Sequence, residues 1–338
     1  MLIRLLASRI VNQLRCWWSY ALSLFGVVRV RHLPTFVSVE PSSVCQLRCP
    51  ECPVGMRRKE SREHRPISSV HSGLMPIEVF ERVLEQTQST AHTMQFYFQG
   101  EPLLNKRLPE MIARAHQAGL YTIVSTNAQV LDKSMANALV NSGLDRIIVS
   151  IDGFSDESYA AYREGGSLQK ALEGLQFLRD SKAIHHSSIR VELQVLRLRS
   201  NEHEWGWIQR HYKSLGATHL VFKTAQFYDY KDGNPLMPTE ERYSRYRKTA
   251  DGTYRLRRPH LSSSSRVSPC YRLWSGCVIT TQGEVLPCCY DKEHGYSFGN
   301  IMKDDLRTIF HSQVADDLRC RVLLHPDKLP DMCTNCNH

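Results

Sequence analysis

Short runs of β-branched and aromatic residues alternate with amphipathic stretches between residues 35 and 223, and this alternation limits the fold more than any other feature. The runs occupy residues 35–40, 93–98, 121–125, 146–150, 189–195 and 219–223. The stretches between them have the period of helices that bury one face, and they occupy residues 76–88, 108–118, 132–141, 167–179 and 202–214. Because β-α units in series form a parallel sheet, we predict an α/β fold: a partial TIM-like (β/α)6 barrel.

Polar motifs follow the first four predicted strands. A cysteine-rich loop follows the first strand, and QGEPLLN (99–105), STNA (125–128) and SIDG (150–153) follow the next three. YAAYREGG (159–166) comes soon after the last of these. Each motif alone is an ordinary turn sequence. Functional groups of such barrels gather at the carboxyl ends of the strands, so the order of the motifs predicts one common site.

The cysteine-rich loop VCQLRCPEC carries Cys45, Cys49 and Cys52 at C-x-x-x-C-x-x-C spacing. Three thiolates this close can hold three irons of a cubane iron-sulfur cluster and leave the fourth iron open for chemistry. A structural zinc site is the alternative, because close cysteine pairs also bind zinc and a closed zinc site takes four ligands. His64 and His71 are the candidates for the missing zinc ligand.

The cysteines and the motifs that follow them resemble those of the radical S-adenosylmethionine (SAM) superfamily, over about residues 35–225. The resemblance implies that Cys45, Cys49 and Cys52 bind a [4Fe-4S] cluster whose open iron binds SAM. Reductive cleavage of SAM then yields methionine and a 5′-deoxyadenosyl radical, which abstracts hydrogen from a substrate carbon. One position departs from the superfamily: the residue before the third cysteine, often aromatic there, is Glu51, which leaves adenine packing at that position open.

The same resemblance assigns contacts with SAM. Gly100 lets the backbone approach the ligand, and the region of Glu101 accepts hydrogen bonds from the SAM ammonium group. Ser150 and Arg163 bind the SAM carboxylate, for which an arginine fork is better suited than a lysine. The methionyl or ribose groups contact Thr126, Asn127 and Asp152.

Residues 269–338 form a second cysteine-rich segment, which resembles the SPASM/twitch-type auxiliary-cluster domain of radical SAM enzymes in its short form. The resemblance implies a second [4Fe-4S] cluster with four thiolate ligands and no open iron. The implied ligands are Cys270, Cys288, Cys333 and Cys336. A zinc-ribbon site is the alternative. Cys289 can replace its neighbour Cys288. Cys277 can be a ligand only in the longer form of the domain, which binds two clusters and needs more cysteines than this segment has. Cys16 and Cys320 have the character of small apolar core residues.

Residues 1–34 predict an amphipathic helix. Its apolar stripe consists of Leu14, Trp17, Trp18, Ala21, Leu22 and Phe25. Residues 1–39 contain five arginines and no acidic residue, so the helix can lie on an anionic membrane surface or bind a partner. We favour packing of the stripe against the barrel, because most amphipathic helices pack in this way. The uncharged stretch Cys16 to Val28 has thirteen residues, fewer than the roughly 20 that span a bilayer.

Composition excludes other classes. A chain of 338 residues with 42% hydrophobic content builds a substantial core. Its eleven cysteines do not indicate a disulfide scaffold, since that class is short and exported, and Arg9 and Arg15 interrupt the apolar region of a signal peptide. We therefore expect a cytoplasmic protein whose thiols bind metal. The net charge of +9 permits acidic partners or RNA, but no recognisable RNA-binding module accompanies it, so no nucleic-acid partner is expected.

We therefore predict four regions: the amphipathic helix in 1–34, a radical SAM core in 35–225, a linker or lid in 226–268 and an auxiliary-cluster domain in 269–338. The expected function is reductive cleavage of SAM for oxidation or crosslinking of a peptide or a small molecule. The expected partner is an electron donor such as flavodoxin or ferredoxin. The competing hypothesis is a zinc-stabilised basic protein that binds RNA or membrane, and membrane contact through the N-terminal helix is compatible with both.

Overall fold

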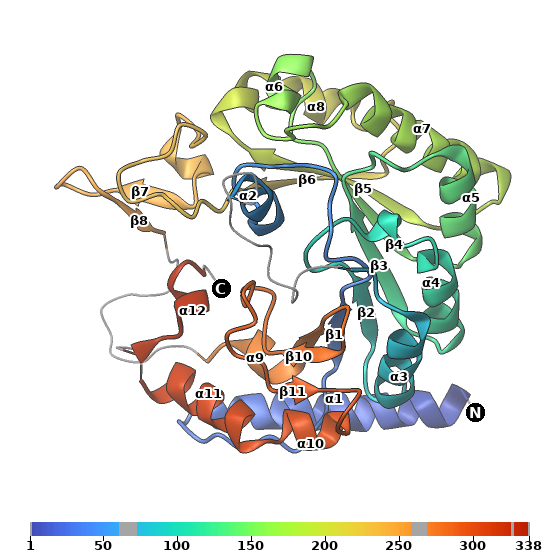
Figure 1. The fold of residues 1–338 in the computed structure, drawn as a ribbon, viewed down its shortest axis with the longest axis vertical. Helices are drawn as coiled ribbons and strands as arrows, with labels where there is room; N and C mark the ends of the chain where they lie inside the picture. Colours follow the sequence, from blue (N-terminus) through green and yellow to red (C-terminus); the bar gives the residue numbers. More distant parts are fainter. Residues whose placement is uncertain (1, 61–72, 258–268, 326–327, 337–338) are drawn as a thin grey trace.

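The computed structural model of the chain describes residues 2–60, 73–257, 269–325 and 328–336. Its centre is one sheet with the strand order β11-β10-β9-β1-β2-β3-β4-β5-β6 (Figure 1). The six predicted strands are β1 to β6, which span Phe36–Val39, Thr93–Phe96, Tyr121–Thr126, Arg146–Ser150, Arg190–Arg197 and His219–Thr224. Each is parallel to the next. The sheet curves around an open concave side, so the predicted α/β partial barrel is confirmed (Figure 1).

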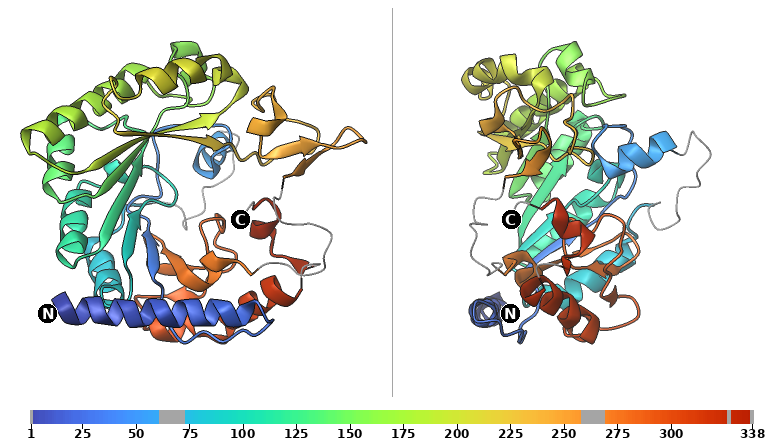
Figure 2. Two further views of the ribbon diagram at one scale, coloured as in Figure 1. Left: turned by 180° about the vertical axis from the view of Figure 1, so that it is seen from behind. Right: turned by 90° about the vertical axis from the view of Figure 1, so that its left-hand side faces the viewer.

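Helices cover the convex face of this sheet (Figures 1 and 2). They are α3 (Ile77–Thr87), α4 (Leu108–Gln117), α5 (Lys133–Asn141), α7 (Leu168–Ile184) and α8 (Trp205–His211). Two short helices, α2 (Pro53–Glu60) and α6 (Asp156–Ala160), follow the cysteine loop and β4, and single 3-10 turns cover Pro102–Leu104 and Arg199–Glu204.

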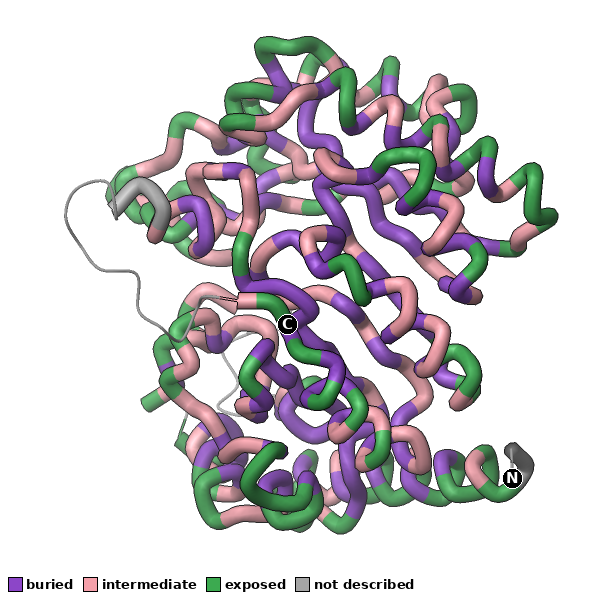
Figure 3. The backbone as a smooth tube through the Cα atoms, turned by 45° about the vertical axis from the view of Figure 1, so that its right-hand side comes forward, coloured by how far each residue is buried: buried purple, intermediate pink, exposed green. Residues whose placement is uncertain are grey.

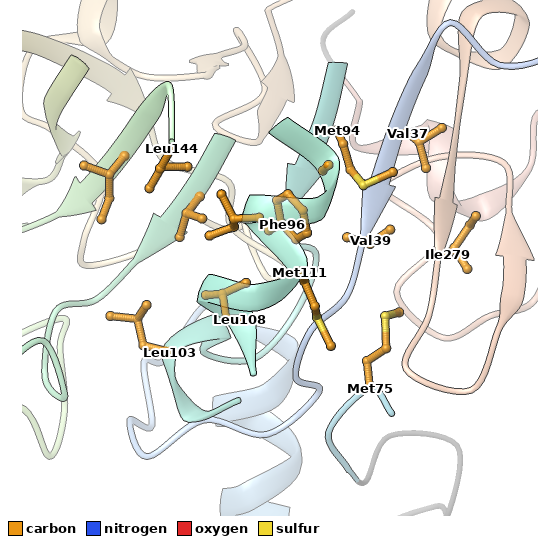
Figure 4. Packing of buried hydrophobic residues seen from close by; sticks show 14 of the residues in the cluster. Val37, Val39, Met75, Met94, Phe96, Leu103, Leu108, Met111, Leu144 and Ile279 are labelled. Carbon is orange, nitrogen blue, oxygen red and sulfur yellow. The ribbon is translucent and has the colours of Figure 1, made fainter. Parts of the chain in front are cut away.

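The main core lies between these helices and the sheet. Met94 and Phe96 of β2 are fully buried there with Phe80 of α3 and Met111 of α4 (Figure 4). Successive side chains of a strand point to opposite faces. The strand residues between those of the core therefore face the concave side, where the polar motifs converge.

The C-terminal segment continues the sheet across β1. Strand β9 (Gly276–Ile279) is parallel to β1, and β10 (Glu284–Leu286) and β11 (Gly299–Asn300) follow as antiparallel strands. Its helices are α9 (Tyr271–Ser275), α10 (Leu306–Phe310), α11 (Gln313–Leu324) and α12 (Asp331–Thr334). Because one sheet crosses the expected boundary at residue 269, the division of the chain into four regions stays a prediction.

The predicted linker or lid is described up to residue 257, and it packs on the cysteine loop. It contains a 3-10 turn, Glu241–Tyr243, and the hairpin β7 (Tyr246–Lys248) and β8 (Tyr254–Leu256). Phe227 and Tyr246 are buried in a second apolar cluster with Leu47 and Cys49 of the loop. We call residues 226–257 the bridging segment.

Helix α1 (Leu2–Ser23) lies along one edge of the molecule, beside α10 and α11 (Figures 1 and 2). The sequence predicts this helix correctly, but the favoured packing of its apolar stripe is wrong. Trp17, Trp18 and Phe25 are exposed, and the face that packs on the barrel is mostly polar, with Cys16 as its buried apolar residue. Exposed and buried residues therefore alternate along α1 in Figure 3. Within the described ranges, no helix combines the length and the apolar content needed to cross a membrane.

Candidate active site at the carboxyl ends of the strands

The cysteine loop follows β1, and two glycines allow the surrounding backbone to approach it closely. Gly100 has a φ of 63°, and a Cβ atom there would lie 2.3 Å from the carbonyl oxygen of Ser42. A Cβ atom on Gly55 would lie 2.3 Å from the carbonyl oxygen of Cys49. Any side chain at either position would displace the loop, since real Cβ atoms do not come this close to backbone. Gly100 therefore allows close approach of the loop backbone, whereas the predicted approach of its backbone to SAM stays a prediction.

The three thiols of the loop lie near one another in a partly buried site. Burial raises the pKa of Cys45 to about 12, and the charges of Cys52 and Cys49 add to the rise. The sulfur of Cys45 also accepts from the backbone N–H of Leu47 and from Nδ2 of Asn127, both at 3.4 Å. Thiols in such a place ionise only when a cation binds them, and N–H donors stabilise the thiolates of an iron-sulfur cluster. The donor set therefore fits a bound cluster.

Glu101 is buried and joins the ends of β2 and β3. Its Oε1 accepts from Oγ1 of Thr126 at 2.6 Å and from the backbone N–H of Leu103 at 3.1 Å, and its Oε2 accepts from the backbone N–H of Asn127 at 2.8 Å. Burial raises the pKa of Glu101, and these three donors oppose the rise. The carboxylate therefore fixes the positions of Thr126 and Asn127, a positioning role that the sequence pattern did not reveal.

Asp152 and Arg163 form a buried ion pair beside the cysteine loop. Nε and Nη2 of Arg163 donate to Oδ2 of Asp152 at 2.7 and 2.6 Å, and Oδ1 accepts from the backbone N–H of Leu196 at 2.7 Å. Burial would lower the pKa of Arg163, but Asp152 and Cys49 raise it above its ordinary value. The guanidinium therefore stays charged next to Cys49, a predicted cluster ligand. Ser150, 6% exposed, ends β4 nearby.

The structure thus brings the predicted residues of the core to one edge of the sheet. They are Cys45, Cys49, Cys52, Gly100, Glu101, Thr126, Asn127, Ser150, Asp152 and Arg163. Their contacts with SAM remain predictions, because the bonds described above are bonds within the protein.

Glu51, the residue that departs from the superfamily pattern, connects the cysteine loop to the bridging segment. Its Oε2 accepts from the backbone N–H of Tyr228 at 2.9 Å, and its Oε1 accepts from Nδ2 of Asn234 at 2.8 Å. Burial raises the pKa of Tyr228 most, and the charge of Cys52 is the second-largest cause of the rise. An aromatic ring therefore lies near the third cysteine, but it comes from another segment. The sequence signal for it was the cluster of tyrosines that starts at Tyr228.

The second set of cysteines comes from three segments. Cys270 precedes α9, Cys288 follows β10, and Cys333 and Cys336 lie in and after α12. Cys289, burial and Cys270 together raise the pKa of Cys288, so Cys270 lies near it. Burial also raises the pKa of Tyr290. The charge of Arg245 opposes this rise, and the charge of Cys336 adds to it. Cys336 therefore lies near Tyr290, which follows Cys288 by two residues.

The last two cysteines depend on the bridging segment for their position. Asn335, which lies between them, accepts from the hydroxyl of Tyr246 at 2.9 Å and donates to the carbonyl of Phe227 at 2.7 Å. The bridging segment therefore contacts both cysteine sets: the first through Glu51 and the second through Asn335.

The remaining cysteines differ in environment. Cys277 is 3% exposed in β9, opposite Val37, and burial raises its pKa to about 12. It packs in the main core. The sulfur of Cys289 accepts a hydrogen bond from Nη1 of Arg272 at 3.2 Å, so this cysteine contacts a cationic side chain. Its part in an auxiliary cluster stays a prediction.

The arrangement of the side chains does not distinguish a zinc site from an iron-sulfur site. Among the residues that the structure describes, no group of three His, Cys, Asp or Glu side chains is arranged to hold a metal ion. His64 and His71, the candidates for a fourth zinc ligand, lie outside the described residues.

Comparison with known proteins gives two family matches. The radical SAM superfamily matches residues 39–190, and an iron-sulfur cluster-binding domain, SPASM, matches residues 270–337. The PqqA peptide cyclase of Granulibacter bethesdensis is 23% identical over 324 residues, which cover 90% of this chain and 80% of the cyclase.

Two solved structures share the fold. SuiB of Streptococcus suis bound to the precursor peptide SuiA has a TM-score of 0.60 at 14% identity, over 85% of this chain and 67% of SuiB. BtrN in complex with AdoMet and 2-DOIA has a TM-score of 0.52 at 17% identity, over 92% of this chain and 95% of BtrN.

The chain belongs to the radical SAM superfamily and carries a C-terminal SPASM domain. It is an enzyme that uses a [4Fe-4S] cluster and SAM, with iron-sulfur binding in the SPASM domain. A cluster held by Cys45, Cys49 and Cys52 would supply the electron for reductive cleavage of SAM. The protein supplies the thiolates, the N–H donors to Cys45 and the buried network of Glu101 and Asp152 that positions the strand ends.

Proposed function

We propose that the enzyme oxidises or crosslinks a peptide, and that the reacting part of the peptide carries an acidic side chain. The peptide is supported by the likeness to a PqqA peptide cyclase and by the fold shared with SuiB in its complex with SuiA. The acidic side chain is supported by one observation in this chain, the excess of cations on the concave face of the sheet.

Two arginines on the concave face share a buried carboxylate. Ile147 and Val191 are buried under the helices, so their neighbours Arg146, Arg190 and Glu192 face the other side. Nη2 of Arg146 lies 2.7 Å from both oxygens of Glu192, and Nη2 of Arg190 lies 3.1 Å from Oε2. The Nε atoms of both arginines are buried and have no hydrogen-bond partner in the described residues. One carboxylate thus faces two guanidinium groups.

Two further cations lie near this group. Lys223 is exposed near the end of β6, and partial burial of its amine lowers its pKa, a fall that Glu192 opposes and Arg146 and Arg272 increase. Its side-chain amine forms no ion pair or hydrogen bond with another residue in the described part of the chain. Arg272 belongs to α9, the helix that begins directly after Cys270. The cationic surface therefore extends to the second cysteine set.

Uncompensated positive charge in a concave site favours an anionic ligand. An acidic side chain of a substrate would restore the balance of charge, and it would lie between the SAM site at the strand ends and the SPASM cysteines. BtrN, whose complex holds 2-DOIA, shows that the same fold also occurs with a ligand of another kind. Peptide specificity therefore needs a direct test.

The test uses reconstituted, reduced enzyme and matched synthetic peptides that differ only by Glu or Gln. We expect the acidic peptide to stimulate formation of 5′-deoxyadenosine and to be modified in proportion to it. Lys223→Gln should reduce the preference for the Glu peptide over the Gln peptide about tenfold. This factor corresponds to the free energy of a hydrogen bond to a charged group. Lys170→Gln, an exposed lysine on the outer helix α7, is the control. Equal use of both peptides would contradict the acidic specificity, and stimulation by no peptide would contradict the peptide substrate.

We also infer that a small acidic protein such as flavodoxin or ferredoxin supplies the electron. The net charge of +9 supports an acidic donor, since opposite charges speed association. The rate of SAM cleavage with either donor should fall as salt rises. A rate that does not depend on salt would contradict an electrostatic encounter.

A further inference from the structure

The inner face of α1 is polar, and directional hydrogen bonds fix it. Arg9, only 4% exposed, donates to the carbonyls of Gln88, Ala118 and Gly119 at 2.5 to 2.9 Å. Gln88 and Ala118 cap the carboxyl ends of α3 and α4, where a cation satisfies free carbonyls and the helix dipole. Asn12 adds bonds to the carbonyl of Leu33 at 2.9 Å and to its N–H at 2.9 Å. The helix cannot rotate to bury its apolar side without breaking these bonds.

The outer face of α1 is apolar and exposed. Large side chains on it are more than half exposed: Leu6 56%, Ile10 51%, Leu14 54%, Trp17 55%, Trp18 67% and, just after the helix, Phe25 83%. Leu324 at the end of α11 extends this surface, since it lies beside Gly26 and is 50% exposed. A contiguous apolar surface of this kind on a folded protein marks an interaction site.

The charges around this surface point to an anionic partner. Arg4 and Arg15 flank the apolar side by helical spacing, Arg29 and Arg31 follow, and all four are exposed. Residues 1–39 contain no acidic residue. A second copy of the chain fits poorly, because a two-fold interface would bring these arginines against their own counterparts.

We propose that α1 lies in the plane of an anionic phospholipid surface, with its tryptophans at the level of the lipid head groups. A helix with one apolar face, arginines at its edge and aromatic residues binds the membrane interface without crossing it. Tryptophan favours this interface, because its ring is apolar and its N–H remains hydrated. The polar inner face holds the enzyme on the opposite side of the helix. This inference depends on α1 and the surface around it and not on the identity of the substrate.

The experiment measures binding of the reconstituted full chain to phosphatidylcholine vesicles that contain phosphatidylserine. We expect binding that is strong at low salt, weakened by high salt, and absent with pure phosphatidylcholine, since arginines near an anionic surface supply much of the affinity. The double variant Trp17→Gln/Trp18→Gln should weaken binding at least tenfold, because both rings leave the interface. Both side chains are exposed, so the fold and the cleavage of SAM should remain unchanged.

The matched control is Trp207→Gln, a tryptophan on α8 that is 41% exposed and should not affect vesicle binding. Deletion of α1 is a poorer test, because it removes Arg9 and Asn12 from the barrel. The proposal is wrong if the full chain does not bind the anionic vesicles or if the double variant binds them as well as the parent. A dimer in solution that the double variant dissociates, without vesicle binding, would assign the surface to a second copy instead.

Discussion

The two cysteine sets are held in different ways. Cys45, Cys49 and Cys52 lie within one loop, and the ends of β2, β3 and β4 surround that loop with a buried network. The second set is assembled from three segments, one before α9, one after β10 and one at α12. A local set is defined by its own spacing, whereas an assembled set depends on packing between distant parts of the chain.

The bridging segment makes this difference testable. It contacts the first set through Glu51 and the second through Asn335, but only the second set needs it to bring cysteines together. Damage to the first set should therefore stop the chemistry directly. Damage to the second set should change the structure of one end of the molecule and leave the first cluster in place.

Loss of a ligand from the first set should have the largest effect. Cys49→Ala leaves two thiolates in the loop and places the charge of Arg163 beside an apolar side chain. We expect formation of 5′-deoxyadenosine to fall by more than about 100-fold, beyond the loss caused by removal of an outer-shell partner. The measurement is anaerobic turnover after reconstitution and reduction. Cys320→Ala on α11 is the control, and unchanged turnover in Cys49→Ala would refute the assignment.

Loss of a ligand from the second set should be more limited. Cys333→Ala should lower bound iron by about four atoms per chain, one cluster of the four-iron type. The spectrum of the first cluster should still change when SAM is added, because the loop and the strand ends are intact. Iron analysis and electron paramagnetic resonance give both readouts. Loss of all iron at once would show that the two sets are not independent.

Mild acid should lower the stability of the folded protein through His32. Burial lowers the pKa of His32 to about 4, below its ordinary 6.5. Its Nε2–H donates to the carbonyl of Trp274 at 2.8 Å, and its Nδ1 accepts from Ser19 at 3.2 Å, so the folded protein holds the neutral ring between α1 and α9. Arg319 and His311 also act on its pKa and oppose its protonation.

The sign follows from which state binds the proton. Between pH 6.5 and about 4 the unfolded chain takes up a proton at His32 and the folded chain does not, so stability falls as pH decreases. From pH 7.5 to 5.5 the loss is about 1.4 kcal/mol. Thermal unfolding at both pH values measures it. His32→Gln should lose less stability over this interval than the parent, whereas the exposed His185→Gln should lose as much. Equal losses in all three proteins would contradict a neutral His32.

The sequence predicted the barrel well, because its signals are local. The runs at 35–40 and 146–150 correspond to β1 and β4, and the helical period at 108–118 corresponds to α4. The pairing of distant strands has no such local signal. Strand β9 pairs with β1 although more than 200 residues separate them, and the pattern of neither strand indicates its partner. The sequence therefore indicated a C-terminal cysteine segment but not its continuity with the barrel sheet.

Helix α1 shows the same limit for a surface. Its period identified a helix with two faces, and general preference assigned the apolar face to the core. The actual orientation depends on Arg9, which meets free carbonyls at the ends of two other helices. The positions of those ends belong to the tertiary fold. In the site, similarly, the motifs located Glu101, but its three donors became evident only when β2 and β3 were side by side.

The smallest expected effect concerns Glu51 and decides which cysteine set the bridging segment serves. Glu51→Ala removes both bonds to the segment, from the N–H of Tyr228 and from Nδ2 of Asn234, while the contacts of Asn335 remain. We expect SAM to bind about fivefold more weakly, or about 1 kcal/mol, the usual net value of a hydrogen bond. Equilibrium dialysis of the reconstituted enzyme measures it.

Glu202→Ala is the matched control. Glu202 accepts from the N–H of Thr239, a residue of the bridging segment, at 2.9 Å, and this contact lies away from the cysteine loop. If both variants weaken SAM binding equally, the segment acts through its general stability. If only Glu51→Ala does so, the residue that departs from the superfamily pattern holds the bridging segment, and with it Tyr228, at the SAM site.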